Sequence, residues 1–578
     1  MHLQITQPQT ANNIHISSWA IALFLLLQGP QSALAAPLYR PEQIRREINT
    51  DEYQLIVQKD GQLDLRRIDG SPILDNALPT VRFADGKQRK LDVDYRRSER
   101  TAIRNPLGQG NGFLFQGRDV EWRVATYPTQ PFLTFDLTFI NHTRKPVQVA
   151  RVSPLGILEG KGAVHLGPMR DGIRMLIPPG EAGDYARILP ESEAAPGHLG
   201  AYNTGTGQVL VAGFLTQQAR PGTVQLTDSD ESPDAFFDRF ACEAIFDPPV
   251  TVEPGERLQA DTLYLAITER DPQEALERFA QAARRLATGD SEESADSDTQ
   301  PVLPVARSLF DWGLTSRSYY LSPAGAIQRD GTMQALTRDT AGFSDHQFIT
   351  AWTLAALQGA LRDPDPDAGG LSPLRQHILA HLLPAPTASA RPLDLFQEGP
   401  PQRWVLPLKT AAGDWTIVAL FNWDTAGAAE LDTPLTALGL NNENYYTVYD
   451  FWASQYLGLI EKQLHAEVPP EGVRLFGLRR YEKRPMLVAS NRHFSQGASD
   501  HTALDWSYET RVLSGSFDAR AATAYTFTVF IPEPYTFKAI ETTAALTAQS
   551  LDGTTLTFTI QTDTPGPTTW RVNCGYAP

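Results

Sequence analysis

The sequence predicts a multidomain, mainly β protein with a short α/β part. The chain has 578 residues, which is more than a single hydrophobic core organises. Apolar and polar residues alternate with the period of a half-buried strand in Phe132–Ile140 and Gln208–Leu215. Between Phe421 and Trp506, short runs of aromatic and β-branched residues are separated by turn residues at hairpin spacing. These patterns predict a large N-terminal sandwich and a second antiparallel β-sandwich near the C-terminus.

The first segment, residues 1–36, has the features of a signal peptide. Trp19–Leu27 is an apolar run, and Ala33–Ala36 offers a small-residue cleavage site. The run is too short to span a bilayer, which needs about 20 apolar residues. The usual positive charge is missing, since no Lys or Arg precedes Arg40. We expect export to the periplasm or the extracellular space, with an uncleaved membrane tether as the alternative.

The next domain, residues 37–268, is expected to be a β-supersandwich that ends in a helix over residues 269–288. Asp271 can cap this helix, Pro272 suits its first turn, and Leu276 and Phe279 share one face. Residues 289–304 are polar and acidic without hydrophobic periodicity, which predicts a solvated linker.

Helix signals dominate residues 305–400. Ser344 with Gln347 three residues later predicts a helix start, and Ser372 followed by Pro373 predicts another helix that ends before Pro384. Residues 401–534 are expected to form the C-terminal β-sandwich. The Thr-rich tail, residues 535–578, is predicted as a β appendage that either closes this sandwich or forms a small module of its own.

Several motifs resemble a known family. The runs Phe421–Asp424, Tyr446–Trp452, Gly472–Arg480 and Ser490–Gly497 resemble the C-terminal sandwich of melibiase-type α-galactosidases and the related raffinose-synthase group. The stretches Phe348–Gly359, Leu371–Arg375 and Arg391–Phe396 resemble the end and exit of the catalytic (β/α)₈ barrel of that family. A complete barrel takes about 250 residues, whereas residues 302–400 amount to about a hundred. The resemblance therefore implies a truncated barrel remnant between the two sandwiches.

Glycoside cleavage needs two carboxyl groups that flank the scissile bond. The resemblance implies a nucleophile in a Lys-x-Asp strand and an acid in an Arg-x-x-x-Asp strand. The one Lys-x-Asp of the sequence, Lys90-Leu91-Asp92, lies in the N-terminal sandwich, where we interpret it as an ordinary strand edge. Arg307 and Asp311 match the acid pattern, so Asp311 is the candidate acid and Arg307 the residue that orients it. A local salt bridge or a strand-end role is the alternative.

Other residues are weaker candidates. Trp312 and Asp330 are weak candidates for substrate binding. Asp330, Asp339 and Asp345 could line the mouth of a partial barrel, but the favoured interpretation of each is a turn or cap residue. The Asp363–Asp367 loop is expected to be structural, because it has no Glu at the twelfth position of a calcium loop. His493 is expected to be a structural histidine. The aromatic clusters around Trp415, Trp423 and Trp452 are expected to belong to the core.

The composition of the chain argues against some classes of binding partner. The formal net charge of −17 argues against binding to a nucleic-acid backbone. No Gly-rich nucleotide loop is present, so no cofactor is expected. Cys242 and Cys574 do not have the spacing of a metal site, and they are expected either to pair or to be separately buried thiols. The expected partner is a carbohydrate. We expect no membrane span after signal removal, and a homodimer formed through the open barrel edge.

Two functional hypotheses follow from these observations. The favoured one is a carbohydrate-binding pseudoenzyme that keeps both sandwiches but lacks the nucleophile strand. The alternative is an active glycosidase that hydrolyses terminal glycosidic bonds, with Asp311 as acid and an unidentified second carboxylate. A partner chain that supplies the missing strands would be another route to activity.

Overall fold

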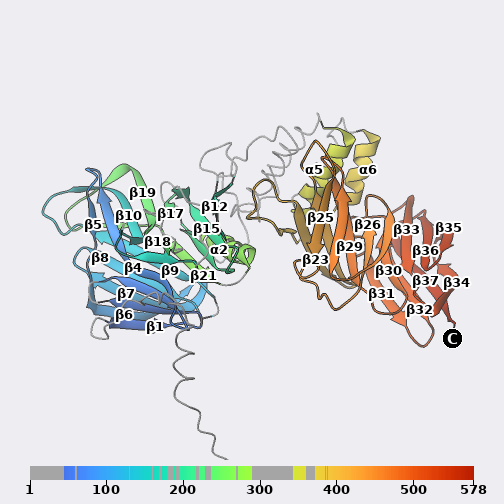
Figure 1. Cartoon of the computed structure of the whole chain (residues 1–578), viewed down its shortest axis with the longest axis horizontal. Coiled ribbons are helices and arrows are strands. Elements are labelled where there is room, and N and C mark those ends of the chain that lie inside the picture. The colour runs from blue at the N-terminus through green and yellow to red at the C-terminus, as the bar shows by residue number, and fades with distance from the viewer. Residues whose placement is uncertain are drawn as a thin grey trace, which may run out of the picture.

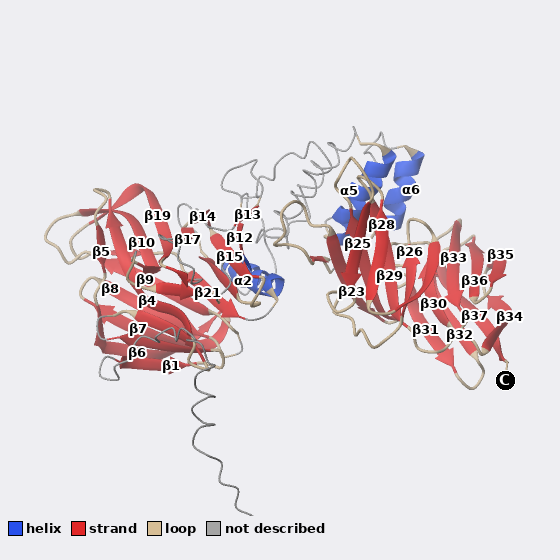
Figure 2. Cartoon of the chain, in the orientation of Figure 1, coloured by secondary structure: helices blue, strands red, loops and turns tan. Residues whose placement is uncertain are grey.

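Strands dominate the structure, a computed structural model, and only three helices are seen in its described part (Figures 1 and 2). The described residues are 44–58, 61–128, 130–158, 160–167, 172–178, 186–189, 194–216, 221–227, 236–268, 271–288, 343–359, 372–384, 386 and 388–577. The predicted fold class, mainly β with a short helical part and a C-terminal β-sandwich, is confirmed. No closed barrel occurs within these ranges.

Two large sheets form the N-terminal half. The first sheet has 11 strands in the order β1 (Ile44–Asn49), β2 (Tyr53–Gln58), β3 (Leu63–Arg67), β4 (Pro72–Phe83), β10 (Val147–Ile157), β19 (Arg239–Val252), β17 (Thr223–Thr227) and β14 (Ala195–Pro196). Three short strands join it beside this path, namely β5 (Gln88–Lys90), β11 (Ala163–His165) and β18 (Phe236–Phe237).

The second sheet has 10 strands. Their order is β13 (Arg187–Leu189), β12 (Ile173–Ile177), β15 (His198–Asn203), β16 (Val209–Phe214), β21 (Leu263–Thr268), β9 (Leu133–Ile140), β8 (Val120–Thr126), β7 (Gly108–Gly117) and β6 (Val93–Asn105), with β20 (Arg257–Gln259) paired to β9. The two strands expected from alternation, at residues 132–140 and 208–215, are thus present as β9 and β16.

The core of this half lies between the two sheets. Trp122 of β8 and Phe135 of β9 stack there with ring centroids 6.1 Å apart, and both side chains are fully buried. Apolar residues of the first sheet, such as Val81 and Val152, complete the same core. Burying each such side chain contributes about 1.5–3 kcal/mol, which explains why the period-two pattern determines the inward face.

Helix α2 (Pro272–Thr288) covers the outer face of the ten-stranded sheet (Figure 1). Its start is capped as predicted, because the backbone N–H of Gln273 donates to Asp271 Oδ1 at 2.9 Å. Phe279 meets the ring of Tyr264 edge-on at 5.3 Å. Gly213 lets the helix approach, since a Cβ there would lie 2.7 Å from the Phe279 ring.

The C-terminal half begins with a six-stranded sheet and two helices. The sheet order is β22 (Arg391–Pro392), β23 (Arg403–Thr410), β24 (Gly413–Phe421), β29 (Val473–Arg480), β26 (Tyr446–Asp450) and β27 (Gln455–Ile460). One face packs on the strand pair β25 (Ala429–Pro434) and β28 (Gln463–Val468). The opposite face packs on α5 (Asp345–Leu357) and α6 (Pro373–Leu382).

Two four-stranded sheets complete the C-terminal half. One has the order β30 (Met486–Ser490), β33 (Thr523–Phe530), β36 (Thr555–Thr562) and β35 (Ala545–Asp552). The other has the order β31 (His501–Ser507), β32 (Val512–Ala519), β37 (Gly566–Tyr576) and β34 (Tyr535–Thr542). Phe527, Phe558 and Trp570 pack together between them. The tail strands β34–β37 therefore pair within sheets that begin before residue 530.

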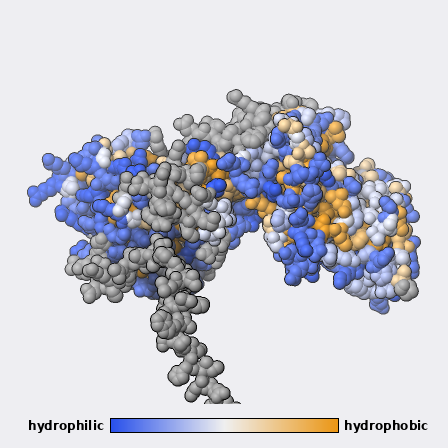
Figure 3. Space-filling view, in the orientation of Figure 1, coloured by the Kyte–Doolittle hydropathy of each residue, from blue (hydrophilic) through white to orange (hydrophobic). Residues whose placement is uncertain are grey.

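Apolar surface is distributed unevenly over the two halves of the molecule. The face shown in Figure 3 is mostly hydrophilic over the N-terminal half, whereas apolar surface gathers on the C-terminal half. The edge strand β27 contributes exposed Leu457 and Leu459.

Of the helices described, α2, α5 and α6, none is long and apolar enough to cross a bilayer. Cys242 and Cys574 are separate buried thiols, so of the two expected arrangements the structure shows the unpaired one.

Candidate functional site

The predicted catalytic and substrate-binding residues, Arg307, Asp311, Trp312 and Asp330, lie outside the described residues. The same is true of Asp339 and the Asp363–Asp367 loop. The described elements nearest to these residues in the sequence are α2 before them, and α5, α6 and residues 388–403 after them. The contacts within these elements show which of their side chains have structural roles.

Helix α5 begins with the capping box that the sequence predicts. The backbone N–H of Gln347 donates to Ser344 Oγ at 3.2 Å, and the Ser344 N–H donates back to Gln347 Oε1 at 2.9 Å. Asp345, expected to be a turn or cap residue, sits in the first turn, where its carboxylate accepts from Arg375 Nε at 2.8 Å. Asp345 therefore joins α5 to α6 and has a structural role.

Polar contacts fix α5 onto the sandwich. Gln347 Nε2 donates to Glu471 Oε1 at 2.9 Å, and Thr350 Oγ1 donates to the Glu471 carbonyl at 3.0 Å. One turn later, Trp452 Nε1 donates to Thr353 Oγ1 at 3.1 Å. Residues 350–357 are all buried. The helix is thus held firmly on the sandwich.

Helix α6 is joined to the loop after β30. Ser372 caps its start and Pro373 opens it, as predicted. At its end, the Phe494 N–H donates to the His381 carbonyl at 2.9 Å, and Arg492 Nη1 donates to the Ala380 carbonyl. These donors satisfy carbonyl groups that a helix end leaves without partners.

Histidines near α6 have structural surroundings. His493 is 2% exposed, its Nδ1 accepts from the Ser495 N–H at 3.2 Å, and burial lowers its pKa. The Nε2 atoms of His377 and His381 lie 3.0 Å apart on α6, and burial lowers the pKa of His381. Two imidazoles alone do not complete a metal site. No group of three or more candidate metal ligands occurs in the described part of the chain.

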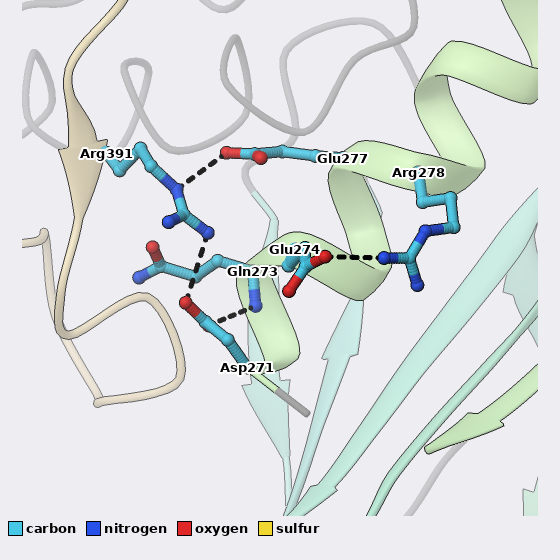
Figure 4. A network of polar contacts seen from close by, with 6 residues as sticks. All are labelled: Asp271, Gln273, Glu274, Glu277, Arg278 and Arg391. Carbon is cyan, nitrogen blue, oxygen red and sulfur yellow. Dashed lines mark hydrogen bonds and ion pairs between the residues drawn. The ribbon is translucent and has the colours of Figure 1, made fainter. Parts of the chain in front are cut away.

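A charged network joins the two halves (Figure 4). Arg391 of β22 donates from Nε to Glu277 Oε1 at 3.0 Å and from Nη2 to Asp271 Oδ2 at 3.1 Å. Both carboxylates belong to the α2 region, so one guanidinium clamps the start of this helix. Because both carboxylates are ion-paired to the same cation, we assign them to the junction.

Apolar contacts reinforce the same junction. Leu395 and Phe396 join the cluster of α2 and the ten-stranded sheet, and Phe396 lies 5.4 Å from the ring of Tyr202. Beside them, Asp394 accepts from the N–H groups of Gln402 and Arg403 at 3.0 and 3.2 Å. Burial raises the pKa of Asp394, but these backbone bonds assign it to the turn that leads into β23.

Every buried carboxyl group in the described part of the chain is held by donors of the fold. Asp64 accepts from the Asn76 N–H at 2.8 Å, and Asp261 accepts from Thr216 Oγ1 at 2.9 Å. Asp450 binds Arg474 and the Ala453 N–H, Glu243 binds Arg82 and Arg151, and Asp394 is held as above. The described residues therefore offer no buried carboxyl pair that could flank a glycosidic bond.

The aromatic clusters belong to the core, as expected. Phe421 and Trp423 stack with centroids 4.9 Å apart and are buried, and Trp415 is 2% exposed. Arg479 lies over the Trp415 ring at 3.8 Å, and burial lowers its pKa to about 10. This buried cation was not predicted, because its neighbours come from separate strands that only the pairing of β24 with β29 brings together.

One family model matches this chain. Residues 398–478 match the alpha galactosidase C-terminal beta sandwich domain, a region that runs from the turn before β23 to β29. The predicted α-galactosidase-like resemblance is thereby confirmed, and it rests on this sandwich. No curated protein sequence matches the chain.

Similar solved structures share little sequence with this chain. The GH36 alpha-galactosidase AgaB from Geobacillus stearothermophilus is 12% identical with a TM-score of 0.30, covering 42% of each chain. Alpha-galactosidase I from Mortierella vinacea is 16% identical with a TM-score of 0.21, covering 24% of this chain and 36% of that chain. An AgaA variant from G. stearothermophilus in complex with raffinose is 9% identical with a TM-score of 0.41, covering 75% of this chain and 100% of that chain. Our chain thus spans less than half the length of the first two proteins.

Proposed function

We propose that this protein is an exported, carbohydrate-binding relative of α-galactosidases whose catalysis is impaired. The observation that carries the proposal is the place of its one Lys-x-Asp motif. Lys90 ends β5, a three-residue strand that pairs only with β4, and Asp92 is an exposed residue of the N-terminal sandwich. The motif is therefore not on a barrel strand, where the resemblance implies the nucleophile.

The carboxylates described above support the same proposal. Glycoside hydrolysis depends on two carboxyl groups that act together, and losing one removes most of the rate. The buried carboxyl groups of both sandwiches and of the junction are held by structural donors. None of these five buried carboxyl groups is therefore available to form a catalytic pair.

An active glycosidase is the second candidate, and the spacing of Arg307 and Asp311 favours it. In this alternative Asp311 is the acid, Arg307 orients it, and Trp312 and Asp330 contact the sugar. The segment leads directly to Ser344, whose capped helix is fixed on the sandwich. A second carboxylate near Asp311 is required for this route.

Hydrolysis of a panel of aryl α- and β-glycosides distinguishes the two candidates. The purified mature chain is compared with Asp311→Asn, and with Asp345→Asn as a matched control that removes a carboxylate of structural role. Circular dichroism confirms that each protein is folded. We expect no release of aryl alcohol by any of the three. Release by the parent and by Asp345→Asn, with loss in Asp311→Asn, would establish the glycosidase.

Export and assembly are tested separately. N-terminal sequencing of the protein recovered outside the cytoplasm should begin near residue 37, and a start at Met1 in a membrane fraction would support the tether instead. Light scattering should show the mass of a dimer, whereas the mass of one chain would contradict the expected homodimer.

A further inference from the structure

A polar hollow of about 330 Å³ lies on the outer face of the eleven-stranded sheet. Its floor comes from β4, β10 and β19, whose labels gather in the same part of Figure 1. Along β4, Val81 faces the core while Thr80 and Arg82 line the hollow. The volume is at the lower end of the range of small-molecule sites, about 300–1,000 Å³.

The hollow is positively charged in an acidic protein. Among the described residues, the ionisable ones that line it are Arg82, Arg151, Arg239 and Glu243. Three cations against one carboxylate leave a local formal charge of +2, whereas the whole chain has a formal charge of −17. Such a concentration of guanidinium groups favours a ligand that carries a carboxylate or a similar oxyanion.

Glu243 holds two of the arginines in place. Its carboxylate accepts from Arg82 Nη2 at 3.2 Å and from Arg151 Nη1, and its side chain is only 10% exposed. Gln88 adds a further link, since its Oε1 accepts from Arg82 Nη2 at 3.3 Å and its Nε2 donates to Thr80 Oγ1 at 3.1 Å. The cationic floor is thus fixed before any ligand arrives, which lowers the entropic cost of binding.

One donor on this floor has no partner. Arg82 Nε is buried, and no acceptor in the described part of the chain lies within hydrogen-bond distance. A buried N–H of a charged group that lacks an acceptor costs free energy. Because Nε itself is covered, an oxyanion in the hollow would contact the exposed parts of the Arg82 and Arg151 side chains, each of which is 39% exposed.

The remaining lining is suited to hydroxyl groups rather than to ring stacking. Gln88 and Gln225 contribute amide groups, whereas the hydroxyl groups of Ser153 and Thr80 are buried and already bonded to the Leu155 carbonyl and to Gln88. Phe240, the aromatic residue among the described lining residues, has its side chain fully buried in the core, so it offers no face to a sugar ring. A neutral sugar would lack the stacking contact that aromatic rings provide.

We propose that this hollow binds a sugar acid, with the carboxylate of a hexuronate at the exposed guanidinium groups of Arg82 and Arg151 and its hydroxyl groups at the amides of Gln88 and Gln225. The site lies in the N-terminal sandwich and is independent of the proposed function, because it uses none of the residues assigned to glycoside cleavage. Its failure would leave that proposal unchanged.

Isothermal titration calorimetry of the mature chain tests the site with four probes: D-galacturonate, D-galactose, acetate and inorganic phosphate. We expect galacturonate to bind at least about tenfold more tightly than each of the others. A tenfold difference in Kd corresponds to about 1.4 kcal/mol of binding free energy. Galactose lacks the carboxylate, so it tests whether binding depends on that group. Acetate and phosphate lack the sugar ring, so they test whether the ring contributes to affinity. Binding of galactose, acetate or phosphate as tight as that of galacturonate would overturn the proposal, as would no heat with galacturonate.

A pair of variants locates the binding. Gln225→Glu places a negative charge in the hollow without removing any partner of Glu243, and it should weaken galacturonate binding about tenfold or more. Gln259→Glu makes the same change at an exposed position of β20, on the other sheet, and should bind like the parent. Equal affinity of the two variants would place the ligand elsewhere and refute the assignment.

Discussion

The junction between the two halves should depend on Phe396 much more than on Arg391. Arg391 forms two ion pairs, with Asp271 and Glu277, whose side chains are between 33% and 45% exposed. Ion pairs at such exposure contribute about 0.2–1 kcal/mol each, so Arg391→Gln should cost about 1 kcal/mol. Phe396 is 7% exposed and packs in the α2 cluster, and Phe396→Ala should cost about 3 kcal/mol.

Amide hydrogen exchange of α2, followed by mass spectrometry, measures this difference locally. If α2 opens reversibly, each loss of about 1.4 kcal/mol in the free energy of opening raises the exchange rates tenfold. Arg391→Gln should therefore speed exchange in residues 272–286 about fivefold, and Phe396→Ala about a hundredfold.

Arg278→Gln is the matched control for Arg391→Gln. Arg278 pairs with Glu274 within α2 and makes no contact in the junction network (Figure 4). Loss of such a helical pair costs about 0.3–0.5 kcal/mol, an effect of about twofold. If Arg391→Gln accelerated exchange as much as Phe396→Ala, the junction would be held by charge, and our attribution to apolar packing would be wrong.

Two further predictions concern caps and pH. Ser344→Ala should destabilise α5 by about 1 kcal/mol, while Ser344→Gly should cost only a few tenths, as seen by hydrogen exchange of residues 345–357; equal loss in both would contradict a capping role. Burial lowers the pKa of His198 from 6.5 to about 4, so the unfolded chain binds the proton first as pH falls, and stability should drop between about pH 6.5 and 4. His198 alone should remove about 2 kcal/mol of unfolding free energy between pH 7 and 5. Urea denaturation of His198→Phe should lack this part of the pH dependence, and an unchanged slope would refute it.

Local signals in the sequence predicted the elements of the fold well. The caps at Asp271, Ser344 and Ser372 are short-range patterns, and each starts a helix in the structure. Alternation at residues 132–140 and 208–215 identified two strands because one or both faces of each are buried.

Strand pairing across long separations could not be predicted from such patterns. Residues of β37 pair with β32, and β36 pairs with β33, so the tail shares sheets with residues before 530. A Thr-rich alternating strand has the same local sequence in either arrangement. The junction at Arg391 and the hollow at Arg82 likewise depend on residues far apart in the chain.

The candidate acid was predicted from spacing and family resemblance alone, and Asp311 lies outside the described residues. The structure adds that the buried carboxyl groups in the described part of the chain are all held by hydrogen bonds or ion pairs of the fold. This result could not be inferred from composition, because the 67 acidic residues of the chain give no hint of which are held by partners.

The most direct test of the central claim is titration of raffinose, an α-galactoside, into the folded mature chain, with bound ligand and released galactose measured in the same sample. We expect saturable binding of raffinose without release of galactose above the uncatalysed rate. Catalytic release of galactose that Asp311→Asn abolishes would contradict it and identify the protein as a working glycosidase.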